Sequence, residues 1–240
     1  PAKNLGKKVL LITFAHNSYI HLERLIFETQ EFAMEVSFIY MITLCKMSGF
    51  AYAYEDGQTE QFDLYPEQKK FAIKSFSIPD YFAFITFFPT SIFGPSIEFN
   101  DFVNFIDKKE EYQIIPSMIL PSLKRFGLGL LFYIIYIVLS PYGQIKVIEE
   151  QKSFMMKIIF FILGGVHELR YVAGFCLSES SVIASGYAWN GEYSDDKYGK
   201  GKHIEVANLM LVYSPNDFFR YWNISVHFWL KRYVYHRLLP

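Results

Sequence analysis

The sequence predicts an all-α protein, a polytopic transmembrane helical bundle with kinked and interfacial helices. Three observations favour this fold class. Hydrophobic residues make up 52% of the chain and aromatic residues 19%, so it has ample apolar surface to offset the entropy of ordering. Residues 126–145 contain no charged side chain, and a helix that crosses a bilayer needs about 20 such residues. Charged segments separate this run from several other apolar runs, as loops separate the helices of a bundle.

The charge balance excludes two classes of protein. The 23 basic and 24 acidic side chains leave a formal net charge of −1. The chain therefore lacks both the basic surface of a nucleic-acid-binding protein and the acidic excess of a disordered tail. The only two cysteines, Cys45 and Cys176, lie within apolar runs and are expected to be buried thiols.

The N-terminal half is expected to hold two helices and one broken segment. Residues 9–22 are uncharged apart from two histidines, and residues 36–54 carry a single charge, Lys46. Residues 55–74 are rich in charge and indicate a loop. Residues 81–97 are uncharged but contain two prolines and a glycine, so they predict a kinked or broken segment.

The middle of the chain holds an expected interfacial helix and the strongest candidate span. Residues 100–113 are charged, but phenylalanines at helical spacing give them one apolar face, which is typical of an interfacial helix. Within the uncharged run 126–145, residues 128–139 (LGLLFYIIYIVL) show no polar face. Lys124 and Arg125 precede this run, where their side chains could reach a headgroup layer.

Two further apolar runs precede the C-terminal segment. Residues 158–166 are apolar, and residues 171–191 carry only one charge, Glu179. Residues 190–203 are rich in glycine and charge, so they are expected to lie in water.

Charged residues within apolar runs predict a polar interior. Lys46, Glu168 and Glu179 would be costly in lipid, so they are expected to face an internal cavity. Such an interior is what an intramembrane enzyme or a transporter requires. The alternative is a soluble all-α protein, but soluble helices show a polar face that residues 128–139 do not have.

The C-terminal segment, residues 220–239 (RYWNISVHFWLKRYVYHRLL), predicts one long helix. On such a helix an apolar stripe would be formed by Trp222, Val226, Trp229 and Tyr233. Asn223 lies among these aromatic residues and needs a polar partner if it is buried. The same asparagine also begins a glycosylation sequon, or could serve only to bond another helix.

Several catalytic and metal-binding motifs are missing from the sequence. A zinc-protease pattern begins at His167-Glu168, but its second histidine position is occupied by Tyr171. The sequence contains no C-x-x-C pair and no G-x-S-x-G nucleophile motif. We therefore expect no metal site.

Residues 222–238 (WNISVHFWLKRYVYHRL) resemble the asparagine motif of the membrane-bound O-acyltransferase (MBOAT) superfamily. They are most similar to its lysophospholipid acyltransferase branch. Three other stretches agree with the family in order and spacing: residues 46–57 (KMSGFAYAYEDG), 87–106 (FFPTSIFGPSIEFNDFVNFI) and 175–191 (FCLSESSVIASGYAWNG). The resemblance runs from about residue 30 to residue 240.

The resemblance implies an acyl-CoA-dependent O-acyltransferase that transfers a long-chain acyl group to a lysophospholipid in phospholipid remodelling. It implies a multi-pass protein of the endoplasmic reticulum membrane, with acyl-CoA as co-substrate, a lysophospholipid and the bilayer as partners, and no other cofactor. Two alternatives remain. One is another acceptor for the same chemistry (a sterol, diacylglycerol or a protein), and the other is a non-catalytic transporter or scaffold.

The resemblance also implies roles for individual residues. Asn223 takes the place of the catalytic asparagine, and the residues expected to bind substrate are Trp222, His227, Trp229 and Glu179. The family's histidine lies a few tens of residues beyond the asparagine, which is beyond residue 240. His227 and His236 do not match that position. Three cations are expected near the phosphates of acyl-CoA: Lys231, Arg232 and Arg237.

Residues 1–240 are expected to be a single membrane-embedded acyltransferase domain that is incomplete at both ends. The sequence begins with Pro1 rather than Met and ends within an apolar, basic segment.

Overall fold

A computed structural model describes residues 4–27, 36–59, 64–209 and 211–238. These residues form helices and irregular connections, with no β-strand within those ranges. The first six α-helices are α1 (Leu5–Phe27), α2 (Val36–Gly57), α3 (Pro66–Phe71), α4 (Ile78–Ile85), α5 (Phe99–Ile106) and α6 (Ile119–Leu139). They are followed by α7 (Ile145–Glu149), α8 (Phe154–Gly164), α9 (Leu169–Ser185), α10 (Val206–Leu209), α11 (Pro215–Tyr221), α12 (Ile224–Leu230) and α13 (His236–Leu238). The expected all-α fold is confirmed.

Short 3-10 turns and one π-helical stretch join several of these helices. The 3-10 turns are η2 (Phe88–Thr90), η3 (Glu110–Gln113), η4 (Ser140–Gly143) and η5 (Gly165–Glu168). The π-helical stretch, η6 (Lys231–Tyr235), joins α12 to α13.

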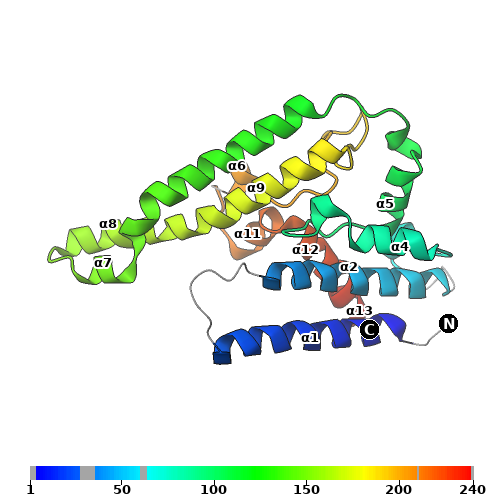
Figure 1. Ribbon diagram of the computed structural model, residues 1–240, viewed down its shortest axis with the longest axis horizontal. Helices are drawn as coiled ribbons and strands as arrows, with labels where there is room; N and C mark the ends of the chain where they lie inside the picture. Colours follow the sequence, from blue (N-terminus) through cyan, green and yellow to red (C-terminus); the bar gives the residue numbers. More distant parts are fainter. Residues whose placement is uncertain (1–3, 28–35, 60–63, 210, 239–240) are drawn as a thin grey trace.

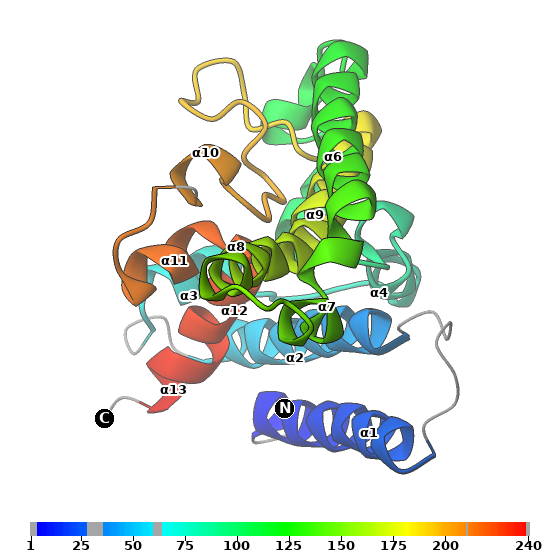
Figure 2. The same ribbon diagram turned by 90° about the vertical axis from the view of Figure 1, so that its left-hand side faces the viewer.

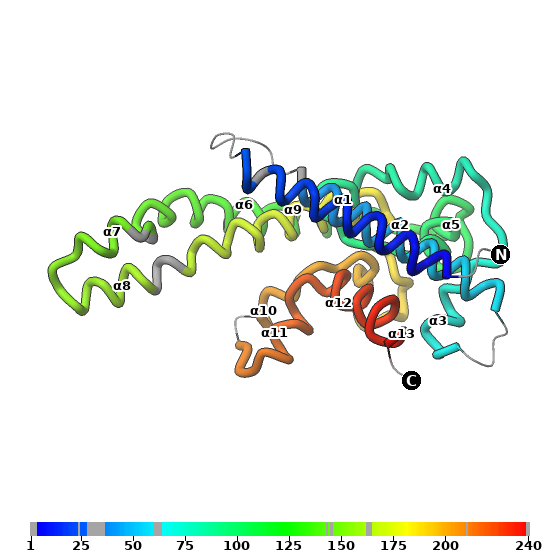
Figure 3. Tube along the Cα trace, turned by 90° about the horizontal axis from the view of Figure 1, so that it is seen from below, coloured from blue at the N-terminus to red at the C-terminus, as the bar shows by residue number. Residues whose placement is uncertain are grey.

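The longest feature is a hairpin in which α6 and α9 run side by side (Figure 1). Helices α7 and α8 form the tip of this hairpin, which projects away from the remaining helices (Figure 3). Two helical stretches here are long and apolar enough to cross a membrane, Ile119–Tyr142 and Phe154–Ser185. Large apolar side chains of α6 are exposed, among them Leu123, Leu130, Leu131, Ile134, Ile137 and Val138. Exposing so large an apolar surface to water is unfavourable, and contact with the hydrocarbon of a bilayer would cover it.

Helices α1 and α2 form a second pair, and α2 lies between α1 and the other helices (Figures 1 and 2). Lys46 on α2 is 1% exposed, and its ammonium donates to the carbonyl oxygens of Phe84 at 3.0 Å and Ile85 at 3.2 Å. Those carbonyls belong to the last turn of α4, where helix carbonyls lack the usual i+4 partners, and that of Phe84 also accepts the backbone N–H of Phe87 at 3.4 Å. Lys46 is therefore buried with polar partners, but it lies against the backbone of α4 and is not part of the lining of the cavity described below.

Buried aromatic side chains join α4, α5 and α9. Phe84, Phe102 and Tyr112 belong to one buried cluster with Tyr187, which follows α9. The hydroxyl of Tyr112 donates to the carbonyl oxygen of Tyr187 at 2.9 Å, so the polar end of a fully buried ring is satisfied. Cys45 and Cys176 are buried free thiols, as expected.

Three expectations about local structure are wrong. Glu168 is exposed and does not face an interior. Residues 100–113 do not form one helix, since α5 ends at Ile106 and Lys108 and Glu110 adopt positive φ angles. Residues 220–239 are not one helix either, because α11 ends at Tyr221 and α12 begins at Ile224.

Candidate active site

Asn223 lies at the break between α11 and α12. It precedes the first residue of α12 and has φ +47° and ψ +50°, the left-handed conformation. Asparagine tolerates this conformation better than most residues with a side chain. The preceding Trp222 is extended, with φ −106° and ψ 129°. A continuous helix is therefore impossible here, and the break turns the Asn223 side chain away from the direction that a continuous helix would give it.

The segment containing residues 203 and 204 lies beside this break. The backbone N–H of Ile224 donates to the carbonyl oxygen of His203 at 2.8 Å. Two residues after His203, the backbone N–H of Glu205 donates to the carbonyl oxygen of Tyr221 at 3.0 Å. These two bonds fix the position of the Asn223 backbone against the segment before α10.

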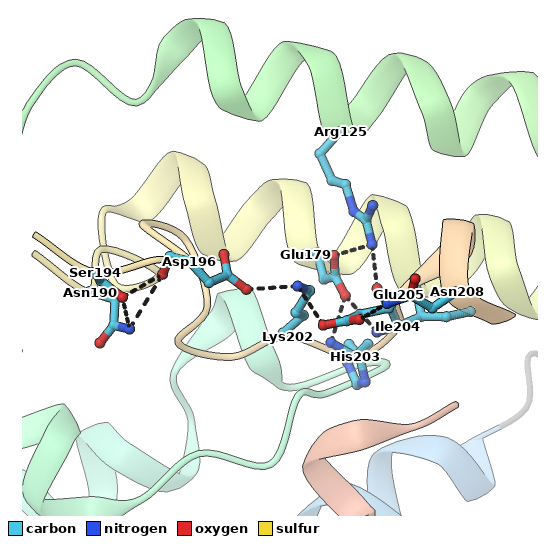
Figure 4. Close-up of polar contacts among 10 residues, drawn as sticks. All are labelled: Arg125, Glu179, Asn190, Ser194, Asp196, Lys202, His203, Ile204, Glu205 and Asn208. Carbon is cyan, nitrogen blue, oxygen red and sulfur yellow. Dashed lines mark hydrogen bonds and ion pairs between the residues drawn. The ribbon is translucent and has the colours of Figure 1, made fainter. Parts of the chain in front are cut away.

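A buried ion pair holds the same segment from the opposite side (Figure 4). Glu179 on α9 accepts the backbone N–H of His203 at 2.5 Å and that of Ile204 at 2.9 Å. Arg125 on α6 lies 2.5 Å from the other Glu179 oxygen and donates to the carbonyl of Ile204 at 2.9 Å. The Glu179 side chain is 7% exposed and the Arg125 side chain 19%. The hairpin thus binds the segment next to Asn223 through a carboxylate with three hydrogen-bonding partners.

Lys202 extends this polar network towards the glycine-rich loop (Figure 4). Its ammonium lies 2.7 Å from a carboxylate oxygen of Asp196 and 3.0 Å from one of Glu205. The loop was expected to lie in water throughout. Its last residue, His203, is instead 0% exposed, so that expectation is wrong at this end.

Aromatic rings enclose the site on one side. The His203 imidazole stacks on Phe175 of α9, with ring centroids 4.7 Å apart. Phe175 in turn contacts Trp222 edge to face at 5.3 Å, and Phe218 stacks on Trp222 at 5.5 Å. Burial lowers the pKa of His203 to about 4, so its imidazole is neutral at physiological pH.

A cavity of about 140 Å³ opens beside the first turn of α12. Its polar and charged lining includes Glu98, Asp101, Lys200, Lys202, Ser225 and Arg232. The Ser225 hydroxyl accepts the backbone N–H of Ser96 at 3.1 Å, which joins α12 to the segment before α5. This volume is smaller than the roughly 300 Å³ or more of a typical ligand pocket, so it could hold only part of a large ligand.

The three cations expected to meet phosphates are held in ion pairs. Arg237 makes a two-point contact with Asp56 at 2.8 and 2.5 Å. Arg232 pairs with Glu98, and Lys231 lies 3.2 Å from Glu67. These pairs tie residues 231–237 to α2, α3 and the segment before α5.

The predicted substrate-binding residues do not all lie together. Two of them lie near His203. Trp222 contacts the ring of Phe175, which stacks on His203, and Glu179 accepts the backbone N–H of His203. Trp229 is 7% exposed and its indole N–H donates to Ser48 of α2 at 3.2 Å. His227 is half-buried and contacts the ring of Phe228.

Sequence reasoning missed His203 and the partner of Glu179. Arg125 was expected at a headgroup layer, whereas it reaches Glu179 instead. Glu179 is the only charged residue in its apolar run, and this pattern predicts a cationic partner nearby. No comparable signal marks His203, which follows a run of charged and glycine residues. Across the described ranges, no three His, Cys, Asp or Glu side chains gather as a metal site would require.

Comparison with known proteins adds to this geometry. The model of the membrane-bound O-acyltransferase family, MBOAT, matches residues 9–240. A lysophospholipid acyltransferase of Schizosaccharomyces pombe is 25% identical, over 96% of this chain and 48% of its own. Human lysophospholipid acyltransferase 5 is 28% identical over 83% of this chain and 43% of its own. The lysophospholipid acyltransferase of Saccharomyces cerevisiae is 24% identical over 92% and 40%. The chain thus spans less than half the length of these relatives.

Proposed function

Because the chain belongs to the membrane-bound O-acyltransferase family, we propose that the whole protein transfers a long-chain acyl group from acyl-CoA to a lysophospholipid. The observation that carries this proposal is the match over residues 9–240 together with similar proteins that are named lysophospholipid acyltransferases. A membrane protein of this kind takes a lipid acceptor from the bilayer. We place it in the endoplasmic reticulum, where phospholipids are remodelled.

The proposed reaction forms an ester and releases free CoA. The hydroxyl oxygen of the lysophospholipid attacks the thioester carbonyl, a C–O bond forms and the C–S bond breaks. The hydroxyl proton passes to a base and from there to the leaving sulfur. The resemblance implies that the base is a histidine located beyond residue 240, since an imidazole has a pKa suited to this transfer. The reaction uses acyl-CoA as co-substrate and no other cofactor.

Asn223 supplies the polar group at the reacting centre in this proposal. An amide can hydrogen-bond the carbonyl oxygen as negative charge develops there, and such donors are worth most in a site that excludes water. The buried ring of Phe175, with Trp222 packed against it, would provide that exclusion on one side. Water in the same place would hydrolyse the thioester.

The test uses membranes from cells that express the full-length protein. Labelled oleoyl-CoA is supplied with one acceptor at a time: several lysophospholipids, diacylglycerol or a sterol. We expect label in phospholipid, and expect Asn223→Ala to lose it while the protein remains folded. His21→Phe, a change at an exposed position on α1, should keep wild-type transfer. Labelling of the sterol or diacylglycerol alone would contradict the proposed acceptor.

A further inference from the structure

The side chains of His203 and Asn223 contain three buried polar atoms that lack a well-aligned hydrogen bond. They are the two ring nitrogens of His203 and the Oδ1 atom of Asn223. The imidazole nevertheless lies within interaction range of the Asn223 side chain and of the Gly94 backbone. Buried polar groups are rarely left in this state, so the arrangement calls for a functional explanation.

The position of the imidazole is determined by the residues around it. Glu179 and Ile224 fix the backbone of His203 from its two sides, through the N–H and the carbonyl. The ring points away from Arg125 (Figure 4) and stacks on Phe175. On its free side it approaches Gly94 so closely that a Cβ there would lie 2.7 Å from the Cε1 atom of His203. Only glycine leaves room for the ring in this place.

The protonation state of the ring limits what it can donate. The pKa of His203, lowered by burial to about 4, leaves a neutral imidazole with a single N–H. The carbonyl of Gly94 already accepts the Ser178 hydroxyl at 2.5 Å. The Oδ1 atom of Asn223 has no such donor. The Gly94 carbonyl could accept a second bond, but it already has a donor, so the single imidazole N–H satisfies an otherwise unpaired atom only when it donates to Asn223.

We propose that His203 is a positioning residue whose imidazole N–H donates to Oδ1 of Asn223 and so turns the amide –NH2 towards the reacting carbonyl. This inference rests on the proposed acyl transfer. With Oδ1 held by His203, Asn223 acts as a donor: its N–H stabilises the oxygen of the thioester as the hydroxyl attacks. His203 itself neither touches the substrate nor accepts the hydroxyl proton.

Replacement of His203 in the purified full-length protein tests the positioning role. His203→Phe keeps a ring that can stack on Phe175 but removes the N–H. We expect kcat to fall about tenfold to a hundredfold, because small misplacements of a reacting group have effects of this size. The KM values for both substrates should stay unchanged. His203→Asn and His203→Gln each carry an amide N–H, on side chains of different length. At least one of the two should recover most of the kcat. His21→Phe is the matched control.

Replacement of Asn223 tests which end of the amide is used. Asn223→Asp keeps an oxygen for His203 but has no –NH2, so its kcat should fall as far as that of Asn223→Ala. A His203→Phe protein with wild-type kcat would overturn the positioning role. An Asn223→Asp protein with wild-type kcat would overturn the donor orientation.

A stability measurement separates this inference from the proposed function. Thermal unfolding in detergent is measured for His203→Phe, Asn223→Ala and the double variant. If the two side chains are bonded, the double variant loses less stability than the two single losses added together. Strict additivity overturns the contact, whatever the activity. If the wild-type protein transfers no acyl group but the coupling is present, the proposed function fails and the contact stands.

Discussion

The carbonyl oxygen of His203 accepts the backbone N–H of Ile224 at 2.8 Å. This single bond joins the segment held by the α6–α9 hairpin to the first residue of α12. Asn223 precedes Ile224 directly, so the position of its amide depends on contacts made by residues that are distant in the sequence.

Neutralising one member of the Arg125–Glu179 pair should destabilise the protein strongly. Glu179→Gln leaves a buried guanidinium without its carboxylate, which typically costs about 3–5 kcal/mol. The expected result is a clear drop in the unfolding temperature in detergent, together with loss of acyl transfer. Glu192→Gln, in the exposed part of the same loop region, should unfold at the wild-type temperature. Equal unfolding temperatures for Glu179→Gln and Glu192→Gln would contradict the structure.

Stability should decrease below neutral pH because of His203. The pKa of His203 is about 4 in the folded protein, against an ordinary value of 6.5. As the pH falls from 6.5 towards 4, the unfolded chain binds a proton that the folded chain does not, so folding becomes less favourable. The full effect is on the order of 3 kcal/mol, and it is absent above pH 6.5. Unfolding temperatures of the wild type and His203→Phe, compared from pH 7 to pH 5, should converge as the pH falls. Parallel curves would mean that His203 titrates normally.

Substitutions at Asn223 should separate the effect of its backbone conformation on stability from the effect of its side chain on activity. Asn223→Gly accepts the left-handed conformation without strain, so it should fold like the wild type but lose acyl transfer. Asn223→Val is strained at the observed φ of +47°, at a cost of about 1–2 kcal/mol. Circular dichroism melts in detergent, read beside activity, distinguish the two variants. Equal stability of the glycine and valine variants would show that residue 223 is not left-handed.

Removing the buried ammonium of Lys46 on α2 should destabilise the packing of α4. Lys46→Met leaves the carbonyls of Phe84 and Ile85 without their shared donor, at a cost of about 1–3 kcal/mol. The expected outcome is a lower unfolding temperature and faster amide exchange over residues 78–90. Lys197→Met, at an exposed loop position, provides the comparison and should match the wild type in both measurements.

Much of the helical framework follows from the sequence because long apolar runs have few structural alternatives. The uncharged run after Arg125 predicts α6, and the run containing only Lys46 predicts α2. The prolines and glycine between residues 81 and 97 predict the break after α4. Lys46 and Glu179 also follow from the sequence, since a charge in such a run must be buried with a partner or face polar groups.

The arrangement around Asn223 does not follow from the sequence. Residues 220–239 show the periodicity of one helix, and the break at Asn223 is decided by a bond from Ile224 to a residue outside that helix. His203 ends a charged, glycine-rich stretch, and its burial depends on the hydrogen bonds from its backbone and Ile204 to Glu179. Local patterns do not record such tertiary contacts. The assignment of Asn223 as catalytic came from the family resemblance and stays a prediction, as do the roles of Trp222, His227, Trp229 and Glu179.

The Arg125–Glu179 pair also links the pairing of two helices to the segment beside Asn223. Its two members stand on the two candidate spans, so they meet only when these two helices pack against each other. Without that contact the backbone N–H groups of residues 203 and 204 lose the carboxylate that accepts them. The segment beside Asn223 is therefore held in place only when the two candidate spans lie against each other.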